Sequence, residues 1–195
     1  MAEPRFAKLD VKAEFQLLCD PKSSIYTDID RDYEMTIFAL VGEVDEENWE
    51  VATEVGGFTA TLFRFDSALN LGVEPAFTAD AHSMEAEEIY SLLEQDIDRW
   101  AIGRPLHRNT VLLHSIDLRD DLKGTKVEHE AIRTALMGLS SGVSRAFLQL
   151  DAPEMDRAVE RNQAALRYAP LGFKPVGIGS DLLWIDLEAR AFWRS

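Results

Sequence analysis

The residues best placed to do chemistry in this sequence lie at one turn between a strand and a helix. Val111–Leu118 is an apolar run typical of a buried strand, Arg119–Lys126 is a short charged loop, and Val127–Leu139 has a helical pattern. A helix that begins at such a turn offers unpaired N–H groups and the positive end of its dipole to an anion. Lys123 and Lys126 add positive charge there. The turn therefore predicts a place where an anionic ligand binds.

The helix after this turn is expected to pack on a sheet. Its apolar residues recur at helical spacing and form one continuous stripe: Val127, Ala131, Ile132, Ala135, Leu136 and Leu139. A stripe of this width fits a helix that covers one face of a sheet. The strand and the helix together would hold the intervening loop in place.

Two blocks of the sequence carry a family resemblance. Ile116–Ile132, IDLRDDLKGTKVEHEAI, resembles the fourth strand, pyrophosphate loop and following helix of the GNAT superfamily of N-acyltransferases. Asn162–Phe173, NQAALRYAPLGF, resembles the late helix of that family, which ends in Tyr-x-x-x-Gly-Phe before a strand. The blocks place about the C-terminal half of the chain, Val111–Leu187. The resemblance implies an α/β (α+β) fold with a central mixed, mostly antiparallel sheet flanked by helices, in a single domain over residues 1–195.

The resemblance also implies a co-substrate, which is acetyl-CoA or another acyl-CoA. Its pyrophosphate would lie on the loop, and the residues at the matching positions are Leu118, Lys123, Gly124, Thr125, Lys126 and Val127. The implied activity is the transfer of an acetyl or other acyl group to an amine acceptor.

Two residues are candidates for proton transfer in such a reaction. Leu113 and His114 match the Leu-His pair that arylalkylamine-type members carry on this strand, so His114 is the candidate base. Tyr168 lies at the offset where the family uses a tyrosine as general acid. The alternatives are a hydrogen-bonded strand histidine without a catalytic role and a core tyrosine near a helix end.

The loop departs from the family at two positions. Lys126 stands where the family has Gly, and Glu128 stands where it has Gly or Ala. Thr125 and Glu128 have the spacing of a capping box, in which each side chain accepts a hydrogen bond from the other residue's amide. This arrangement would use donors that a phosphate needs. A second hypothesis therefore remains open, namely a GNAT-fold binding or regulatory protein that does not turn over acyl-CoA.

Other chemistry is less well supported by the spacing of residues. His82, His107 and His129 show no metal-ligand spacing with carboxylates or with Cys19, so no metal site is predicted. His129 lies in a Glu-His-Glu run that is expected on the solvent side of its helix. Neither a glycine-rich dinucleotide fingerprint nor a Walker loop occurs.

Composition limits the class of protein and the kinds of partner that this chain can have. The chain has 195 residues and is 46% hydrophobic, which is enough for a core of its own. The lone Cys19 excludes an internal disulfide and, with no apolar run of about 18 residues, favours a cytoplasmic location without a membrane partner. A net charge of -15 argues against nucleic acid and favours a cationic acceptor, either a small molecule or a protein amine, although acidity also serves solubility. A homodimer is left open.

The remaining patterns predict the elements around the turn. Before it we expect strands and a helix at Val11–Cys19, Tyr33–Val44, Trp49–Phe65 and His82–Trp100, with a loop at Asp66–Thr78. After it we expect a strand, a helix and a hairpin at Ala146–Leu150, Pro153–Ala169, Phe173–Val176 and Leu182–Leu187.

Overall fold

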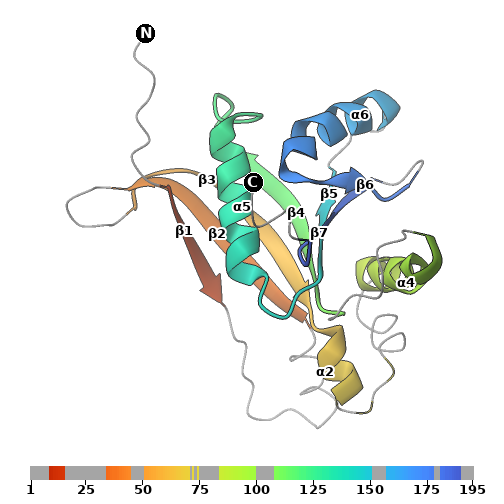
Figure 1. Cartoon of the computed structure of the whole chain (residues 1–195). Coiled ribbons are helices and arrows are strands. Elements are labelled where there is room, and N and C mark those ends of the chain that lie inside the picture. The colour runs from red at the N-terminus through yellow and green to blue at the C-terminus, as the bar shows by residue number, and fades with distance from the viewer. Residues whose placement is uncertain are drawn as a thin grey trace.

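The strands that the structure describes form one mixed sheet (Figure 1). The computed structural model describes residues 9–15, 34–44, 51–70, 72, 74, 84–99, 108–150, 157–177 and 181–189. Its strands are β1 Leu9–Phe15, β2 Glu34–Val44, β3 Val51–Phe63, β4 Thr110–Leu118, β5 Arg145–Gln149, β6 Lys174–Pro175 and β7 Leu182–Asp186. In most of these strands apolar and polar residues alternate or β-branched residues are common, as is usual in sheets.

The strand order agrees with the fold class expected from the sequence. The 7-stranded sheet has the order β1-β2-β3-β4-β5-β7-β6. All neighbouring strands are antiparallel except β4 and β5, which run parallel and are joined by the helix α5, Lys126–Leu139. A parallel pair requires a crossover of this kind, whereas antiparallel pairs can follow one another through turns. The expected mixed, mostly antiparallel sheet flanked by helices is thereby confirmed.

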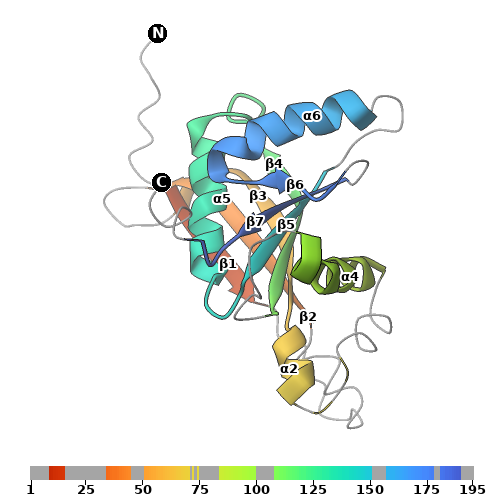
Figure 2. The same cartoon turned by 45° about the vertical axis from the view of Figure 1, so that its right-hand side comes forward.

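Helices cover both faces of the sheet (Figure 2). On one face lie α5 and the pair formed by α6, Arg157–Tyr168, and the 3₁₀ helix η1, Ala169–Leu171. On the other face lies α4, Met84–Arg99. The core under α5 and the core under α4 are separate clusters of buried side chains.

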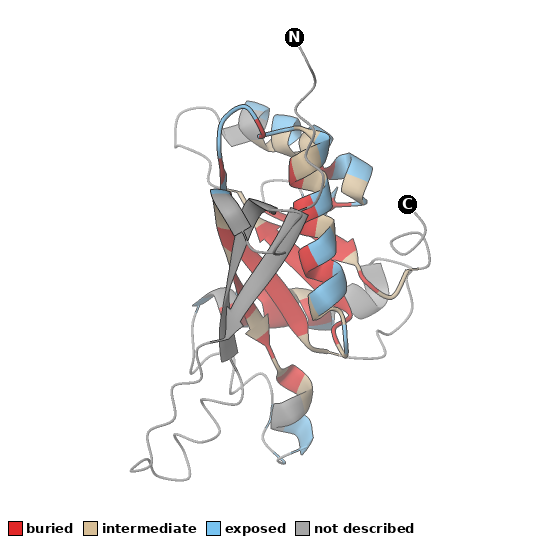
Figure 3. Cartoon of the chain, turned by 90° about the vertical axis from the view of Figure 1, so that its left-hand side faces the viewer, coloured by how far each residue is buried: buried red, intermediate tan, exposed pale blue. Residues whose placement is uncertain are grey.

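The strand β4 contributes to both cores because its side chains alternate between the two faces. Val111 and Leu113 are fully buried against α5, and Leu112 is buried in the α4 cluster. Buried residues also line the inner face of α5, whereas its outer face is exposed (Figure 3). The expected stripe is confirmed, since Ala131, Ile132, Ala135 and Leu136 are buried and Val127 and Leu139 pack against the same core.

A glycine allows β3 to approach the end of β4 closely. Gly56 pairs with Leu118 and has φ +145°, and a Cβ atom at this position would lie 2.2 Å from the carbonyl oxygen of Asp117. The β2–β3 register shifts between Val41 and Gly42, opposite Gly56, as at a β-bulge. The amide of Arg119 then donates to the Val55 carbonyl at 2.9 Å, which fixes where the loop leaves the sheet.

The prediction of a loop over Asp66–Thr78 is wrong at its start, where the structure has the helix α2, Phe65–Asn70. Phe65 is fully buried, and its ring lies 5.9 Å from that of Phe63 and 5.1 Å from that of Tyr90. Contacts with a distant helix therefore decide the local structure here.

The other elements were predicted at shifted bounds, and Cys19, His82, Trp100 and His107 lie outside the described residues.

Candidate active site at the divergence of β4 and β5

The two parallel strands at the centre of the sheet separate partway along their length. β4 and β5 pair from Thr110 with Arg145 to Leu113 with Leu148. Beyond this point β4 continues against β3 as far as Leu118, while β5 continues against β7. Within the described residues, His114–Leu118 thus has a strand neighbour on one edge alone. Backbone groups on the other edge can serve a ligand.

His114 lies where the separation begins. It is the extra residue of a β-bulge, because Thr59 pairs with Ser115 and Ala60 pairs with Leu113. The His114 Nε2 atom lies 2.7 Å from Thr61 Oγ1. This side chain therefore lies on the α4 face of the sheet, which Thr61 shares with Leu112, its pairing partner. The contact itself fits both predictions for His114, the base and the hydrogen-bonded strand histidine.

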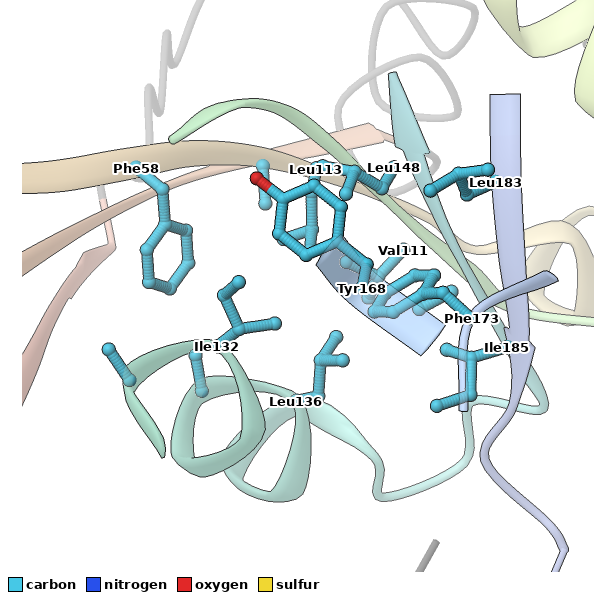
Figure 4. Close-up of a cluster of buried hydrophobic side chains, with 14 of the residues drawn as sticks. Phe58, Val111, Leu113, Ile132, Leu136, Leu148, Tyr168, Phe173, Leu183 and Ile185 are labelled. Carbon is cyan, nitrogen blue, oxygen red and sulfur yellow. The ribbon is translucent and has the colours of Figure 1, made fainter. Parts of the chain in front are cut away.

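Tyr168 lies on the opposite face, at the end of α6. Its side chain is 7% exposed and belongs to the core under α5, where its ring meets that of Phe173 edge-on at 6.3 Å. Figure 4 shows the ring among the side chains that surround Leu113, with the hydroxyl directed away from Phe173. Burial, followed by the negative charge of Glu128, raises the pKa of Tyr168 to about 12. The phenol is therefore neutral at physiological pH.

The two predicted catalytic side chains thus lie on different faces of the sheet. Atoms between the separated strands would be accessible to both faces, whereas the paired part of the sheet keeps the faces apart. His114 and Tyr168 can act in one reaction only if the reacting atoms lie past Leu113 and Leu148, where the pairing of β4 with β5 ends.

The residue that organises the loop is Glu128, which was not among the predicted site residues. Its side chain is fully buried, and its two oxygens accept from four donors. Oε2 accepts from the Gly124 amide at 2.7 Å and from Arg167 Nε at 2.7 Å. Oε1 accepts from Arg167 Nη2 and from the Tyr168 hydroxyl at 3.3 Å. A buried carboxylate is tolerated when a cation and hydrogen-bond donors satisfy it in this way.

Two expectations about Glu128 are therefore wrong. It does not form the capping box with Thr125, because its carboxylate binds the Gly124 amide and the Thr125 hydroxyl donates to the Leu122 carbonyl at 2.6 Å. It also does not lie on the solvent side of α5. The sequence held a signal for this, since Glu128 precedes Ala131 and Ile132 by three and four residues and so shares their face.

The predicted pyrophosphate-binding residues surround the loop but differ in their environment. Leu118 is buried, Val127 is half-buried, and Lys126 is exposed at the first turn of α5. Lys123 Nζ donates to Asp120 at 2.7 Å, and this hydrogen bond raises the pKa of Lys123. The Gly124 amide is used by Glu128, whereas the amides in the first turn of α5 have no intrahelical acceptor by position.

The described residues contain no group of three or more His, Cys, Asp or Glu side chains that could hold a metal ion. Among the helices described, none is long and apolar enough to span a bilayer.

The environment of Tyr168 predicts how stability depends on pH. The folded-state pKa of about 12 exceeds the ordinary value of 10.0, so above pH 10 the unfolded chain loses this proton first. The contribution of the neutral Tyr168 phenol to the free energy of unfolding is complete below pH 10 and is lost as the pH rises through 12. From pH 8 to 11 the wild type should lose about 1.4 kcal/mol more of its unfolding free energy than Tyr168→Phe does. Urea unfolding at both pH values measures this, and equal losses in the two proteins would contradict it.

Comparisons with known proteins give a distant likeness. No family model and no curated protein matches the chain. Among solved structures, AtaT complexed with acetyl-methionyl-tRNAfMet is 14% identical, with a TM-score of 0.42, over 95% of this chain and 100% of that chain. The KacTA-DNA complex is 12% identical, with a TM-score of 0.40, over 91% and 93%. AtaTR bound with acetyl-CoA is 12% identical, with a TM-score of 0.39, over 91% and 94%.

Two of these complexes contain nucleic acid. The expectation that this chain has no nucleic-acid partner stays a prediction.

Proposed function

We propose that this protein is an N-acyltransferase that moves an acetyl or other acyl group from acyl-CoA to an amine. The observation that carries the proposal is the separation of β4 from β5 after Leu113 and Leu148, with His114 on one face and Tyr168 on the other. An extended amide-containing chain, such as the pantetheine arm of coenzyme A, can add to an unpaired strand edge as a further strand does.

The chemistry of acyl transfer sets three demands. An alkyl amine with a pKa of about 10.4 must lose a proton before it attacks the thioester. The tetrahedral intermediate carries an oxyanion, and the departing thiolate needs a proton. In this proposal His114 accepts the proton of the amine, backbone N–H groups at the free edge of β4 stabilise the oxyanion, and Tyr168 protonates the thiolate.

The loop and first turn of α5 would hold the pyrophosphate of the co-substrate. Lys123 and Lys126 supply charge near it, and the open amides of the first turn supply donors. The net charge of -15 suits a cationic amine, either on a small molecule or on a protein, because opposite charge attracts such an acceptor.

A second candidate function rests on Glu128. Its buried carboxylate uses the Gly124 amide and the Arg167 guanidinium, which are groups that a pyrophosphate would otherwise engage. A chain whose loop stays closed in this way would act as a binding or regulatory protein without turning over acyl-CoA.

Thermal unfolding with acetyl-CoA tests the two candidates. At about 100 times its Kd, the ligand should stabilise the native state by about 2.7 kcal/mol and raise the Tm by several degrees. Adenosine at the same concentration is the control, since it lacks the pyrophosphate. No shift at millimolar acetyl-CoA would contradict the acyltransferase and favour the second candidate.

A further inference from the structure

Three groups with separate roles in the proposed reaction converge on one carboxylate. The Gly124 amide belongs to the pyrophosphate loop, Arg167 is a cation at the end of α6, and the Tyr168 hydroxyl is the proposed acid. All of them donate to Glu128, which is itself 0% exposed. The Arg167 side chain is 32% exposed, so this cation can be reached from solvent.

We propose that Glu128 is an internal competitor of the co-substrate, which holds the loop and Tyr168 in a resting state until the acyl-CoA pyrophosphate displaces it. This inference rests on the acyltransferase function proposed above. It adds that binding of the co-substrate and release of the acid are one event.

The competition follows from the chemistry of the donors. A carboxylate and a phosphate accept from the same groups, and an arginine fork binds either of them through two parallel hydrogen bonds. When the pyrophosphate takes Arg167 and the Gly124 amide, Glu128 loses three of its four donors. The remaining contact, from the Tyr168 hydroxyl at 3.3 Å, cannot hold a buried carboxylate alone.

The release of Glu128 changes what Tyr168 can do. In the resting state the hydroxyl proton points to Glu128 Oε1, and the nearby negative charge disfavours the phenolate. After displacement the hydroxyl can donate to a thiolate instead. Glu128 is thus a positioning residue, since it acts on the reaction through Arg167 and Tyr168.

Nuclear magnetic resonance on the wild-type protein tests displacement directly. The Gly124 N–H and Arg167 Nε–H signals should move when acetyl-CoA is added, because both groups exchange Glu128 for another acceptor. Arg161, also on α6, is the matched control, since its Nε bonds Asp181 at 2.5 Å away from the loop. Unchanged Gly124 and Arg167 signals in a protein saturated with acetyl-CoA would overturn the proposal while leaving the acyltransferase intact.

A substitution series gives a second, kinetic test. Glu128→Gln removes the competing charge but keeps the size of the side chain, so the KM for acetyl-CoA should fall about tenfold, equivalent to about 1.4 kcal/mol. The kcat should change little, because in the wild type Glu128 has already left when the complex forms. Asp181→Asn is the matched control, since it changes the net charge equally by removing the carboxylate beside Arg161. Its KM should stay within about twofold of wild type.

The outcomes separate the two proposals. Equal KM values for wild type and Glu128→Gln, with turnover in both, would refute the competition and retain the enzyme. Absence of acetyl-CoA binding to either protein at millimolar ligand would refute both. If Glu128→Gln does not fold, the resonance experiment on the wild type decides.

Discussion

Replacing Arg167 with alanine is expected to lower the free energy of unfolding by about 3 kcal/mol, the largest effect on stability predicted for this chain. The change leaves the Glu128 carboxylate buried without its cation, and breaking a buried ion pair by removing one partner typically costs about 3 to 5 kcal/mol. The lower end applies because the Arg167 side chain is 32% exposed and solvent screens part of the charge. Urea unfolding at pH 7 measures the loss.

Arg161→Ala is the matched control for this experiment. It removes an arginine from the same helix whose carboxylate partner, Asp181, is 37% exposed, whereas Glu128 is fully buried, so the loss should be about 0 to 1 kcal/mol. The double variant Glu128→Ala with Arg167→Ala should recover part of the stability, because no unpaired charge remains buried. A single Arg167→Ala variant as stable as Arg161→Ala would show that the buried pair does not govern this part of the fold.

The burial of Glu128 could be predicted from the sequence only in part. The strand β4 and the helix α5 were predicted within about a residue, because apolar spacing along a single segment records which side faces the core. The same spacing includes Glu128, yet a carboxylate in a core stripe is explained only by its partner. That partner, Arg167, lies 39 residues away on another helix, and the residues near Glu128 in the sequence do not predict the pairing.

The helix α2 illustrates the same point for secondary structure. The residues around Asp66 are of types that favour turns. The structure has a helix there because Phe65 packs in the core against Tyr90 of α4. The candidate site shares this property, because the sequence identified Tyr168 and His114 individually. Their arrangement on two faces depends on where β4 leaves β5, which is a feature of the register between strands.

Tyr168→Phe should have the largest effect on activity. If Tyr168 protonates the departing thiolate, its loss should lower kcat by about 10² to 10⁴, while the affinity for acyl-CoA stays near that of the wild type. Calorimetry with acetyl-CoA checks the affinity, and steady-state rates with an amine acceptor give kcat. Tyr90→Phe is the matched control, since Tyr90 is a buried tyrosine on the other face whose hydroxyl accepts from Arg108 at 3.3 Å. If the two variants turn over equally, Tyr168 has no part in the proton transfer.

The pH profile of the same enzymes distinguishes an acid held by Glu128 from one that has been released. A general acid works while it is protonated, so kcat should fall as the pH rises through its pKa. With Glu128 beside it the pKa of Tyr168 is about 12, which makes the phenol a weak donor to a thiolate whose own pKa is about 8.5. Displacement of Glu128 removes part of the rise in the pKa of Tyr168. The fall of kcat at high pH, the basic limb of its profile, should then be centred below pH 12, toward the ordinary tyrosine pKa of 10.0. A limb at the same pH in wild type and Glu128→Gln indicates that the carboxylate has left in the working complex. A wild-type limb that lies higher than that of Glu128→Gln would mean that Glu128 stays on Tyr168 throughout turnover.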